Sequence, residues 1–371
     1  MKRIQKMRCI VCAAFFLCLA AGGCIALLRT PDAVSLSERR ALRQRPALSL
    51  ESLASGDFFT DTEEYLLDQF PARDSFRRVK ATVQYGFFRK IANNGIVIDR
   101  GQAAELSYPL KDKFVDIYLS RLNKVADEHL AGLELKVYHT LIPDKIFYMD
   151  DRTGIPRIDY DGLRSRLSAE GPGAYIDVTD TLCLSDYYGS DPHVKIASMV
   201  GMADRLLGQM QAGRVGEVRE GEALGPFYGA YYGHSALPLA PDTIVPVYTD
   251  AIGQAAVTRY EGKLRSEGTV YDFAKLEAAD AYDFFLGGAC TVLTLDNPLL
   301  PEGRTLYLFS DSFGRSLAPL LLSGYSRIVF YDLRYVSASQ ALRILPAEND
   351  GDVLFAYSLT SLAVSPSLRV D

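Results

Sequence analysis

The sequence predicts an α/β fold built on a doubly wound, mostly parallel sheet, and three observations lead to this prediction. Short apolar segments with strand patterns alternate with helical patterns between about residues 114 and 358, as is typical of a sheet covered on both faces. An uncharged apolar run lies near the N-terminus, and a stretch rich in Gly, Tyr and Pro interrupts the alternation. A chain of 371 residues is long enough for one large domain with an insertion or for two smaller domains.

Residues 1–29 form the predicted membrane anchor. MKRIQKMR carries four positive charges and no acid, and residues 9–28 contain no charged side chain. A run of this length can span a bilayer once, and the basic flank predicts a cytoplasmic N-terminus with the body outside the cytoplasm. A cleaved signal peptide that releases a secreted body is an alternative because AAGG offers small residues, and a lipoprotein site at Cys24 is a weaker one. The apolar run continues past this point in CIALL, which favours an uncleaved anchor in the cell membrane.

Charge and cysteine content exclude several classes of function. The chain has 46 acidic and 40 basic residues, and five of the basic ones lie in the anchor segment, so the acidic body is a poor match for nucleic acid. Four of the six cysteines lie in the apolar run, which leaves Cys183 and Cys290 to pair if their Cα atoms are close enough. No Cys/His grouping has the spacing of a structural zinc site, and we expect neither a metal nor a cofactor.

The remaining elements follow in order. A polar, proline-punctuated tether at 30–58 leads to the main domain at 59–371, which begins with two short amphipathic helices around Pro71. Residues 213–300 break the later alternation and are predicted to be an insertion that forms a lid or a binding surface. The helical patterns lie at 114–130, 160–170, 194–210, 315–325 and 337–345, and the strand patterns at 133–142, 174–180, 305–309, 327–333 and 352–358.

Two predicted strand ends carry the parts of a serine nucleophile system. Ligands of open α/β sheets bind at the carboxyl ends of the strands. The strand at 305–309 ends in Ser310, Asp311 and Ser312, and the strand at 174–180 leads to Asp191 and His193. A serine hydroxyl needs a base to take its proton, and the base needs a third group to orient it. Ser312, His193 and Asp191 are therefore the candidate nucleophile, base and orienting acid.

Only four histidines can supply the base. His129 lies on a predicted amphipathic helix and is expected to be solvated. His139 shares the parity of apolar strand residues and is expected in the core. His234 lies in the Tyr/Gly-rich insertion and could contact a ligand. His193 alone lies in a strand-end loop with a carboxylate, Asp191, two residues away.

A structural interpretation of the same residues stays open. Asp191 and Pro192 together are an ordinary way to begin a helix, with the aspartate at the N-cap and the proline at the first helical position. Any of the three residues at 310–312 could likewise be only a helix cap. Short motifs of this kind have a high false-positive rate.

Other polar and aromatic residues are candidates for substrate contact. Asp332 and Arg334 end a strand and could orient a substrate, although a structural ion pair is the default. The tyrosines of FYGAYYG could stack on sugar rings or fill a core that has no tryptophan. The candidate substrate-binding residues are Asp311, Tyr188, Tyr232, His234 and Arg334.

Six ordered blocks from about residue 50 onward resemble the DHHW family of membrane-anchored extracytoplasmic proteins. The blocks are SGDFFTDTEEYLLDQFPARDSF, NNGIVI, LIPDKIFY, YIDVTDTLCLSDYYGSDPH, DSFGRSLAPLLLSGYSRIVFYDLRY and DVLFAYS. The family resembles the SGNH-like alginate O-acetyltransferases, in which an Asp-x-His pair precedes the nucleophilic serine. The resemblance implies an SGNH hydrolase-like fold with Asp191, His193 and Ser312 in these roles.

The sequence departs from the family pattern in several places. Asp-His-His-Trp is here Asp191-Pro192-His193-Val194, and Ser310 stands where a Gly-Asp-Ser motif has glycine. No oxyanion-hole asparagine of the ordinary SGNH esterases can be identified. We therefore expect oxyanion donors among the backbone amides at the start of the helix after Ser312.

The resulting hypothesis is an extracytoplasmic O-acyltransferase, specifically an O-acetyltransferase, that modifies a cell-envelope or exported polysaccharide. Its partners would be the polysaccharide acceptor and an acyl donor, which a membrane acyl-transfer protein could deliver. One alternative is a carbohydrate esterase with the same acyl-enzyme chemistry. The other is a non-catalytic glycan-binding or assembly protein on a degenerate scaffold.

Overall fold

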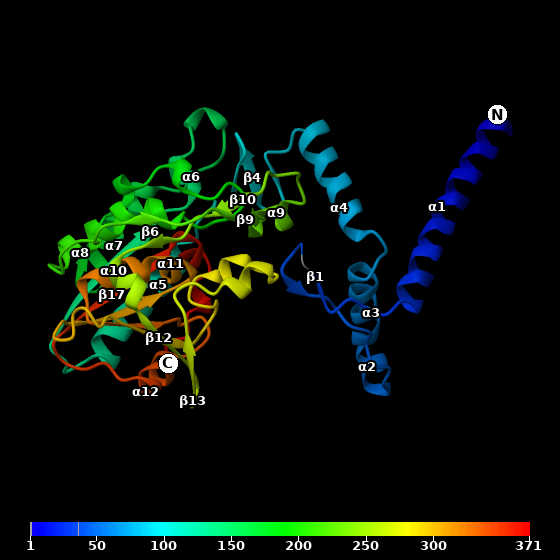
Figure 1. Ribbon diagram of the computed structural model, residues 1–371. Coiled ribbons are helices and arrows are strands. Elements are labelled where there is room, and N and C mark those ends of the chain that lie inside the picture. Colours follow the sequence, from blue (N-terminus) through cyan, green and yellow to red (C-terminus); the bar gives the residue numbers. More distant parts are fainter. Residues whose placement is uncertain (1, 36) are drawn as a thin grey trace. The chain divides into compact units, whose positions relative to one another are not determined.

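The computed structural model describes residues 2–35 and 37–371, and Met1 of the predicted anchor and Leu36 of the predicted tether lie outside the described residues. The chain divides into two compact units (Figure 1). The first comprises Met1–Asn93 with Tyr232–Pro238, and the second comprises Asn94–Tyr231 with Leu239–Asp371.

The first unit begins with one helix that is long and apolar enough to cross a membrane, over Ile4–Leu28 of α1. The predicted tether contains a short hairpin and a helix, and the two helices predicted around Pro71 are both present. The elements of this unit are α1 (Lys2–Leu28), β1 (Val34–Ser35), β2 (Arg40–Ala41), α2 (Leu50–Ser55), α3 (Asp57–Asp68), α4 (Arg73–Thr82), a π-helical turn (Val83–Phe87) and β3 (Ala92–Asn93).

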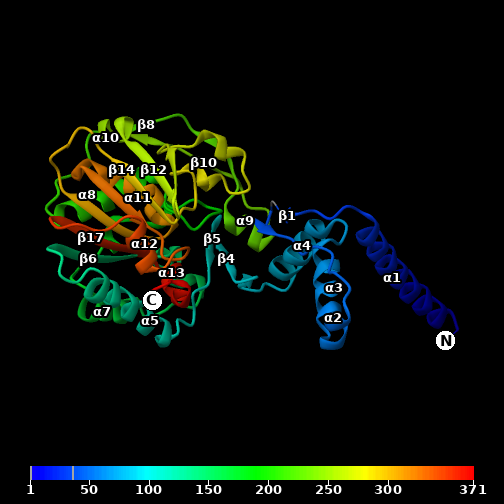
Figure 2. The same cartoon turned by 90° about the horizontal axis from the view of Figure 1, so that it is seen from below.

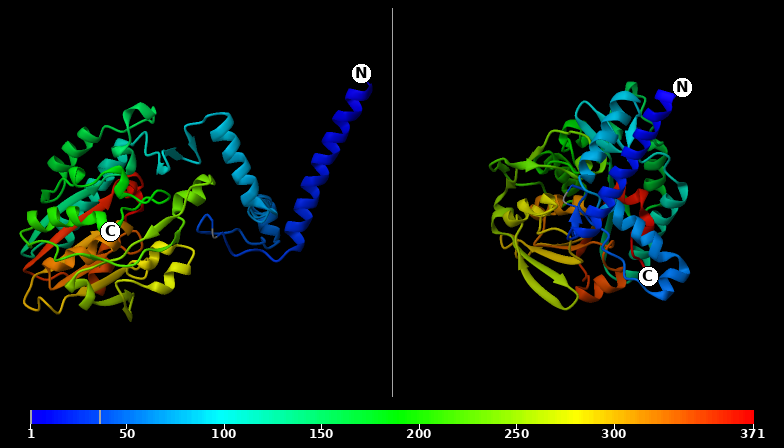
Figure 3. Two further views of the ribbon diagram at one scale, coloured as in Figure 1. Left: turned by 45° about the horizontal axis from the view of Figure 1, so that its top comes forward. Right: turned by 90° about the vertical axis from the view of Figure 1, so that its right-hand side faces the viewer.

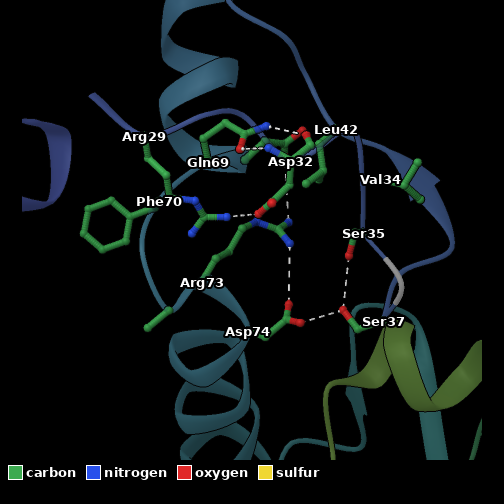
Figure 4. Close-up of a pocket in the computed structure, with 12 residues that line it drawn as sticks. Arg29, Asp32, Val34, Ser35, Ser37, Leu42, Gln69, Phe70, Arg73 and Asp74 are labelled. Carbon is green, nitrogen blue, oxygen red and sulfur yellow. Dashed lines mark hydrogen bonds and ion pairs between the residues drawn. The ribbon is translucent and has the colours of Figure 1, made fainter. Parts of the chain in front are cut away.

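Polar contacts hold the segment after α1 against α3 and α4 (Figure 4). The Gln69 side chain accepts from the Asp32 amide and donates to the Asp32 carbonyl, each at 2.9 Å. The Ser37 hydroxyl donates to Asp74 at 2.8 Å. These residues line a cavity of about 410 Å³. The segment predicted as a tether is therefore folded into this unit.

The second unit is built on an eight-stranded sheet in the order β13-β12-β14-β16-β15-β17-β6-β7. The pairings from β16 to β7 are parallel, and those from β13 to β16 are antiparallel. The strands are β6 (Leu135–Ile142), β7 (Ala174–Tyr175), β12 (Ala256–Glu261), β13 (Leu264–Gly268), β14 (Val292–Asp296), β15 (Thr305–Ser310), β16 (Arg327–Tyr331) and β17 (Gly351–Ser358).

The sheet is mixed, so the prediction of a mostly parallel sheet describes only the half that contains β16, β15, β17, β6 and β7. The antiparallel strands β12, β13 and β14 come from the segment predicted as an insertion, and the β12–β13 hairpin forms the edge of the sheet (Figure 3). Strand and helix patterns do not alternate regularly in this segment, because the strands of a hairpin need no crossover helix between them. The doubly wound connection stays a prediction.

Helices cover both faces of the sheet (Figure 2). Along β15, Leu306 and Leu308 belong to one apolar core, while Tyr307 and Phe309 belong to the other, as expected where successive side chains point to opposite faces. The first core includes α8 (Val200–Gln209) and α11 (Ser312–Leu321). The second includes α5 (Asp112–Lys124), α7 (Tyr160–Glu170), α12 (Ala338–Ile344) and α13 (Leu359–Ala363).

The connections hold shorter elements. Cys183 is exposed and Cys290 is buried, and neither forms a disulfide. The short elements are β4 (Ile96–Asp99), β5 (Gln102–Glu105), α6 (Lys145–Tyr148), β8 (Arg219–Glu220), β9 (Leu224–Phe227), α9 (Ala230–Ser235), β10 (Asp242–Ile244), β11 (Val247–Tyr248) and α10 (Asp250–Gln254).

The register of the parallel strands brings the ends with candidate chemistry to one edge. Ser310 at the end of β15 lies opposite Ala356 of β17, and Ser358 lies opposite Ile142 at the end of β6. The loop that begins with Pro143 and the turn that carries Ser312 therefore leave the same edge of the sheet.

Candidate active site

Ser312 is the first residue of α11, immediately after the strand-to-helix turn. β15 ends at Ser310, and Asp311 has extended backbone angles and caps the helix, with its carboxylate accepting from the Phe313 amide at 2.9 Å. The helix cap in this turn is therefore Asp311. The Ser312 hydroxyl does not cap the helix, and Ser312 is half-buried at the edge of the sheet.

Asp311 has a structural role, in place of the substrate contact that the sequence suggested. Its second carboxylate oxygen accepts from the amide and hydroxyl of Ser358, at 2.9 and 2.6 Å, and from the hydroxyl of Ser361 at 2.6 Å. The residue is 1% exposed. Both carboxylate oxygens of Asp311 accept hydrogen bonds from within the protein, and these bonds connect the start of α11 with the end of β17.

The serine at position 310 is accommodated in the turn. Its hydroxyl donates to the carbonyl of Ala356 on the neighbouring strand. A Cβ atom at Gly314 would lie 2.3 Å from the Ser310 hydroxyl oxygen, so glycine is needed for α11 to pack this closely onto the strand end. The departure from Gly-Asp-Ser therefore leaves a regular turn.

The structure brings the three predicted catalytic residues into one hydrogen-bonded chain. His193 Nε2 lies 2.8 Å from Ser312 Oγ, and His193 Nδ1 lies 2.5 Å from Asp191 Oδ1. The side chain of Asp191 is fully buried, and that of His193 is 9% exposed. This is the connectivity of a nucleophile, a base and an acid that orients the base.

The proposed helix start at Asp191 is wrong. Residues 191–193 form a bend, and a 3₁₀ turn (Ile196–Met199) precedes α8 with Lys195 as its N-cap. The second carboxylate oxygen of Asp191 accepts instead from the Ala230 amide at 2.9 Å. Contacts with a distant segment thus replace the local helix cap that Asp-Pro suggested.

Two charged side chains hold the loop that leads to Asp191. Asp242 accepts from the amides of Gly189 and Ser190 at 2.7 and 2.8 Å. Lys145 is 2% exposed and donates to the carbonyls of Ala103, Tyr188 and Gly189. Burial lowers the pKa of Lys145 to about 7, against the opposing effect of the negative charges on Asp191 and Asp242.

Sequence reasoning missed Gly229 as part of this site. A Cβ atom there would lie 2.3 Å from both the Cβ of Asp191 and the carbonyl oxygen of Ser190. Only glycine lets this backbone approach closely enough for the Ala230 amide to reach Asp191. The glycines of FYGAYYG are the signal in the sequence for this close approach.

Two aromatic rings that the sequence did not single out cover His193. The Tyr282 ring is stacked on the imidazole with centroids 3.6 Å apart and planes 10° apart. The Phe313 ring lies at 4.6 Å and is tilted by 46°. Tyr282 comes from a 3₁₀ turn (Ala281–Phe284) of the predicted insertion, so that segment contributes directly to the site.

The other predicted substrate-binding residues are Tyr188 and Arg334, which have partners within the second unit, and Tyr232 and His234. Tyr188 is fully buried in a hydrophobic core, and its ring packs edge-on against Phe227. Arg334 forms a two-bond ion pair with Asp332, at 2.9 and 2.6 Å, as the structural default predicted. Tyr232 and His234 belong to the first unit.

The remaining histidines have structural surroundings. His139 is 1% exposed, and its ring nitrogens lie 2.8 and 2.9 Å from the carbonyl oxygens of Pro172 and Leu167, so its predicted core position is confirmed. His129 is half-buried and contacts the Asp371 carbonyl oxygen. Within residues 2–35 and 37–371, no three His, Cys, Asp or Glu side chains group as metal ligands.

Two of the expected oxyanion donors are already engaged. The Phe313 amide donates to the Asp311 carboxylate, and the Gly314 amide donates to the Asp311 carbonyl at 3.0 Å. The expectation that amides after Ser312 form the oxyanion hole is therefore wrong for these two.

Solved structures with the same fold include a DHHW family protein and PatB1. The Eubacterium siraeum DHHW family protein matches with a TM-score of 0.60 and 19% identity, over 75% of this chain and 95% of that chain. Bacillus cereus PatB1 matches with a TM-score of 0.54 and 16% identity, over 72% and 96% of the chains, and a second PatB1 structure carries a sulfonyl adduct. The O-acetyltransferase domain of Pseudomonas putida AlgJ matches with a TM-score of 0.45 and 11% identity, over 72% and 92%.

No family model and no curated protein sequence matches the chain. The structural match to the DHHW family protein agrees with the six sequence blocks, which resemble the same family. The chain therefore shares its fold with a DHHW family protein.

Proposed function

We propose that the protein is an extracytoplasmic O-acyltransferase, specifically an O-acetyltransferase, acting on a cell-envelope or exported polysaccharide. The observation that carries this proposal is the hydrogen-bonded chain from Asp191 through His193 to Ser312. The sequence resemblance to SGNH-like O-acetyltransferases supplies the reaction class. The span at Ile4–Leu28 and its basic flank support a single-pass anchor with the body outside the cytoplasm.

The first half-reaction loads the enzyme. Ser312 Oγ bonds to the acyl carbon of a donor ester or thioester while His193 Nε2 accepts the hydroxyl proton. Asp191 holds the imidazole through Nδ1 and stabilises the positive charge that develops on it. The tetrahedral intermediate collapses, and the donor alcohol or thiol leaves with the proton from Nε2.

The second half-reaction returns the enzyme to its starting state. A sugar hydroxyl gives its proton to His193 Nε2 and attacks the acyl carbon. The bond to Ser312 Oγ breaks, and Oγ takes the proton back. We assign oxyanion stabilisation to the Ser312 backbone amide, because the next two amides serve Asp311.

An acceptor experiment tests this function. Full-length protein in detergent is incubated with p-nitrophenyl acetate and either cellopentaose or chitopentaose, and acetylated sugar is measured by mass spectrometry. We expect acetyl transfer that Ser312→Ala abolishes and Ser339→Ala, a serine of α12, retains. Release of acetate without sugar product would favour the esterase, and the absence of any acetyl-enzyme would favour the binding protein.

A further inference from the structure

The imidazole of His193 contacts two aromatic rings, and the closer ring, Tyr282, comes from a different loop. Tyr282 is fully buried and stacks on the imidazole almost in parallel. The neighbour of His193 in sequence, Val194, is aliphatic and points into a hydrophobic core. The parallel aromatic contact to the base therefore comes from a segment far away in the chain.

Tyr282 is fixed by the same helix that carries the nucleophile. Its hydroxyl lies 2.7 Å from the hydroxyl of Ser316, which is one helical turn after Ser312 on α11. On the same helix, the Arg315 guanidinium carbon lies 5.6 Å from the Tyr282 ring centroid, and Arg315 pairs with Asp283 at 2.7 Å. The ring against the base and the nucleophile thus share one rigid support.

A ring in this position restricts the base in a useful way. The imidazole must keep Nδ1 on Asp191 and Nε2 on Ser312 at the same time, and rotation about its Cβ–Cγ bond would break both contacts. A parallel ring at 3.6 Å blocks that rotation. Its electron-rich face also attracts the positive charge that the imidazole carries in the transition state.

We propose that Tyr282 is a positioning residue that aligns His193 for proton transfer with Ser312 through its ring face. The hydroxyl of Tyr282 anchors the ring to Ser316. The aromatic face acts on the base, so it is the part that an active enzyme needs. The inference rests on the proposed function, because it assigns a role in the same reaction.

Variants at position 282 test the proposal through acetyl release from p-nitrophenyl acetate by full-length protein. We expect Tyr282→Leu to lower kcat by about 10- to 100-fold with KM changed less than about threefold, because the base is misaligned while the binding surface is intact. Tyr282→Phe keeps the ring and is expected to stay within about threefold of the wild-type kcat. Tyr271→Leu, which removes a buried tyrosine stacked on Phe284, is the matched control and should retain kcat.

A spectroscopic measurement keeps the test independent of turnover. The chain has four histidines, so labelling them at Cε1 gives four imidazole signals in an NMR spectrum. Loss of the Tyr282 ring current should move the His193 signal downfield in Tyr282→Leu and leave it nearly in place in Tyr282→Phe. If Tyr282→Leu fails to fold, Tyr282→Met removes the ring with a longer and more flexible side chain that fills irregular space.

Three outcomes would overturn the proposal. The first is full kcat in a folded variant without the ring, and the second is an equal loss in Tyr282→Phe and Tyr282→Leu, which would assign the effect to the hydroxyl. The third is an unmoved His193 signal in Tyr282→Leu. A wild-type protein that never forms an acetyl-enzyme would instead contradict the proposed function, while the NMR comparison would still test the ring contact.

Discussion

The two loops that meet at the candidate active site are built in different ways. The turn at 310–314 joins two regular elements: β15 ends at Ser310, Asp311 is the N-cap, and α11 begins at Ser312. The loop at 187–193 is closed by an isolated bridge between Tyr187 and Val194. It is also held from outside by Lys145, Asp242 and the backbone at 229–230. The nucleophile is thus presented by a regular strand-to-helix turn, and its base and acid are presented by an irregular loop.

This difference predicts where each side of the site is vulnerable. In the turn, the same residue, Asp311, stabilises the fold and positions Ser312, because its buried carboxylate belongs to a hydrogen-bond network. In the loop, an asparagine at position 191 can still accept from the Ala230 amide with its carbonyl oxygen, while its amide nitrogen cannot accept from His193 Nδ1. A substitution in the loop should therefore lower acyl turnover with little effect on the stability of the fold. A substitution of Asp311 in the turn should lower both.

The largest expected effect is that of Asp191→Asn. The amide keeps the shape of the loop but favours the wrong imidazole tautomer, so we expect acyl turnover to fall by about 10³- to 10⁴-fold with little change in the unfolding midpoint. Asp186→Asn, in the 3₁₀ turn just before this loop (Leu184–Asp186), where Asp186 accepts from the Cys183 amide, is the control and should stay within about twofold. Equal activity in the two variants would remove Asp191 from the mechanism.

Asp311→Ala should show the opposite behaviour. Four hydrogen bonds to a buried carboxylate disappear, and we expect a loss of about 3–5 kcal/mol in the free energy of unfolding, measured in urea. Asp296→Ala at the sheet edge breaks a partly exposed pair with Arg327 and should cost less than about 1 kcal/mol. Similar losses in both variants would mean that Asp311 does not organise the turn.

Lys145→Met tests the support of the loop. Folding lowers the lysine pKa to about 7, while in the unfolded chain it stays near about 10.4, so the unfolded state binds more protons between these pH values. The unfolding free energy of the wild type relative to Lys145→Met should therefore rise from about pH 7 towards about pH 10.4. Lys195→Met, which removes a half-buried lysine that donates to the Ser185 carbonyl, controls for the loss of a lysine side chain. If the difference in unfolding free energy between the wild type and Lys145→Met does not change with pH, the lowered pKa of Lys145 is contradicted.

Arg334→Gln should have the smallest effect on turnover. The guanidinium is held by Asp332, so we expect kcat and KM for p-nitrophenyl acetate and for the sugar acceptor to stay within about twofold. A tenfold rise in acceptor KM with unchanged kcat would restore Arg334 as a substrate contact.

The sequence sufficed for those parts of the site that local physics determines. The alternation of strands and helices predicted β15, α11 and the strand-end position of Ser312, and the strand-end argument selected His193 over the three other histidines. The cap could not be assigned among Ser310, Asp311 and Ser312, because each can accept a hydrogen bond from a first-turn amide.

Long-range geometry was beyond the sequence. Asp-Pro is a good local helix start, and only the approach of Gly229 shows why Asp191 adopts another conformation. The antiparallel part of the sheet could not be predicted for a related reason. The pairing of β14 with β16 depends on contacts between distant segments, which the periodicity of the sequence does not report. Tyr282 could not be connected with His193 because stacking across distant segments leaves no spacing pattern.

The most direct test of the account is to label the nucleophile. Full-length protein in detergent is treated with a serine-directed fluorophosphonate, and the adduct is located by peptide mass spectrometry. We predict an adduct on Ser312 that disappears in His193→Ala and persists in His129→Ala, with folding checked by thermal unfolding. A folded protein without an adduct on Ser312, or with one that does not depend on His193, would contradict the activated serine on which the proposed acyl transfer rests.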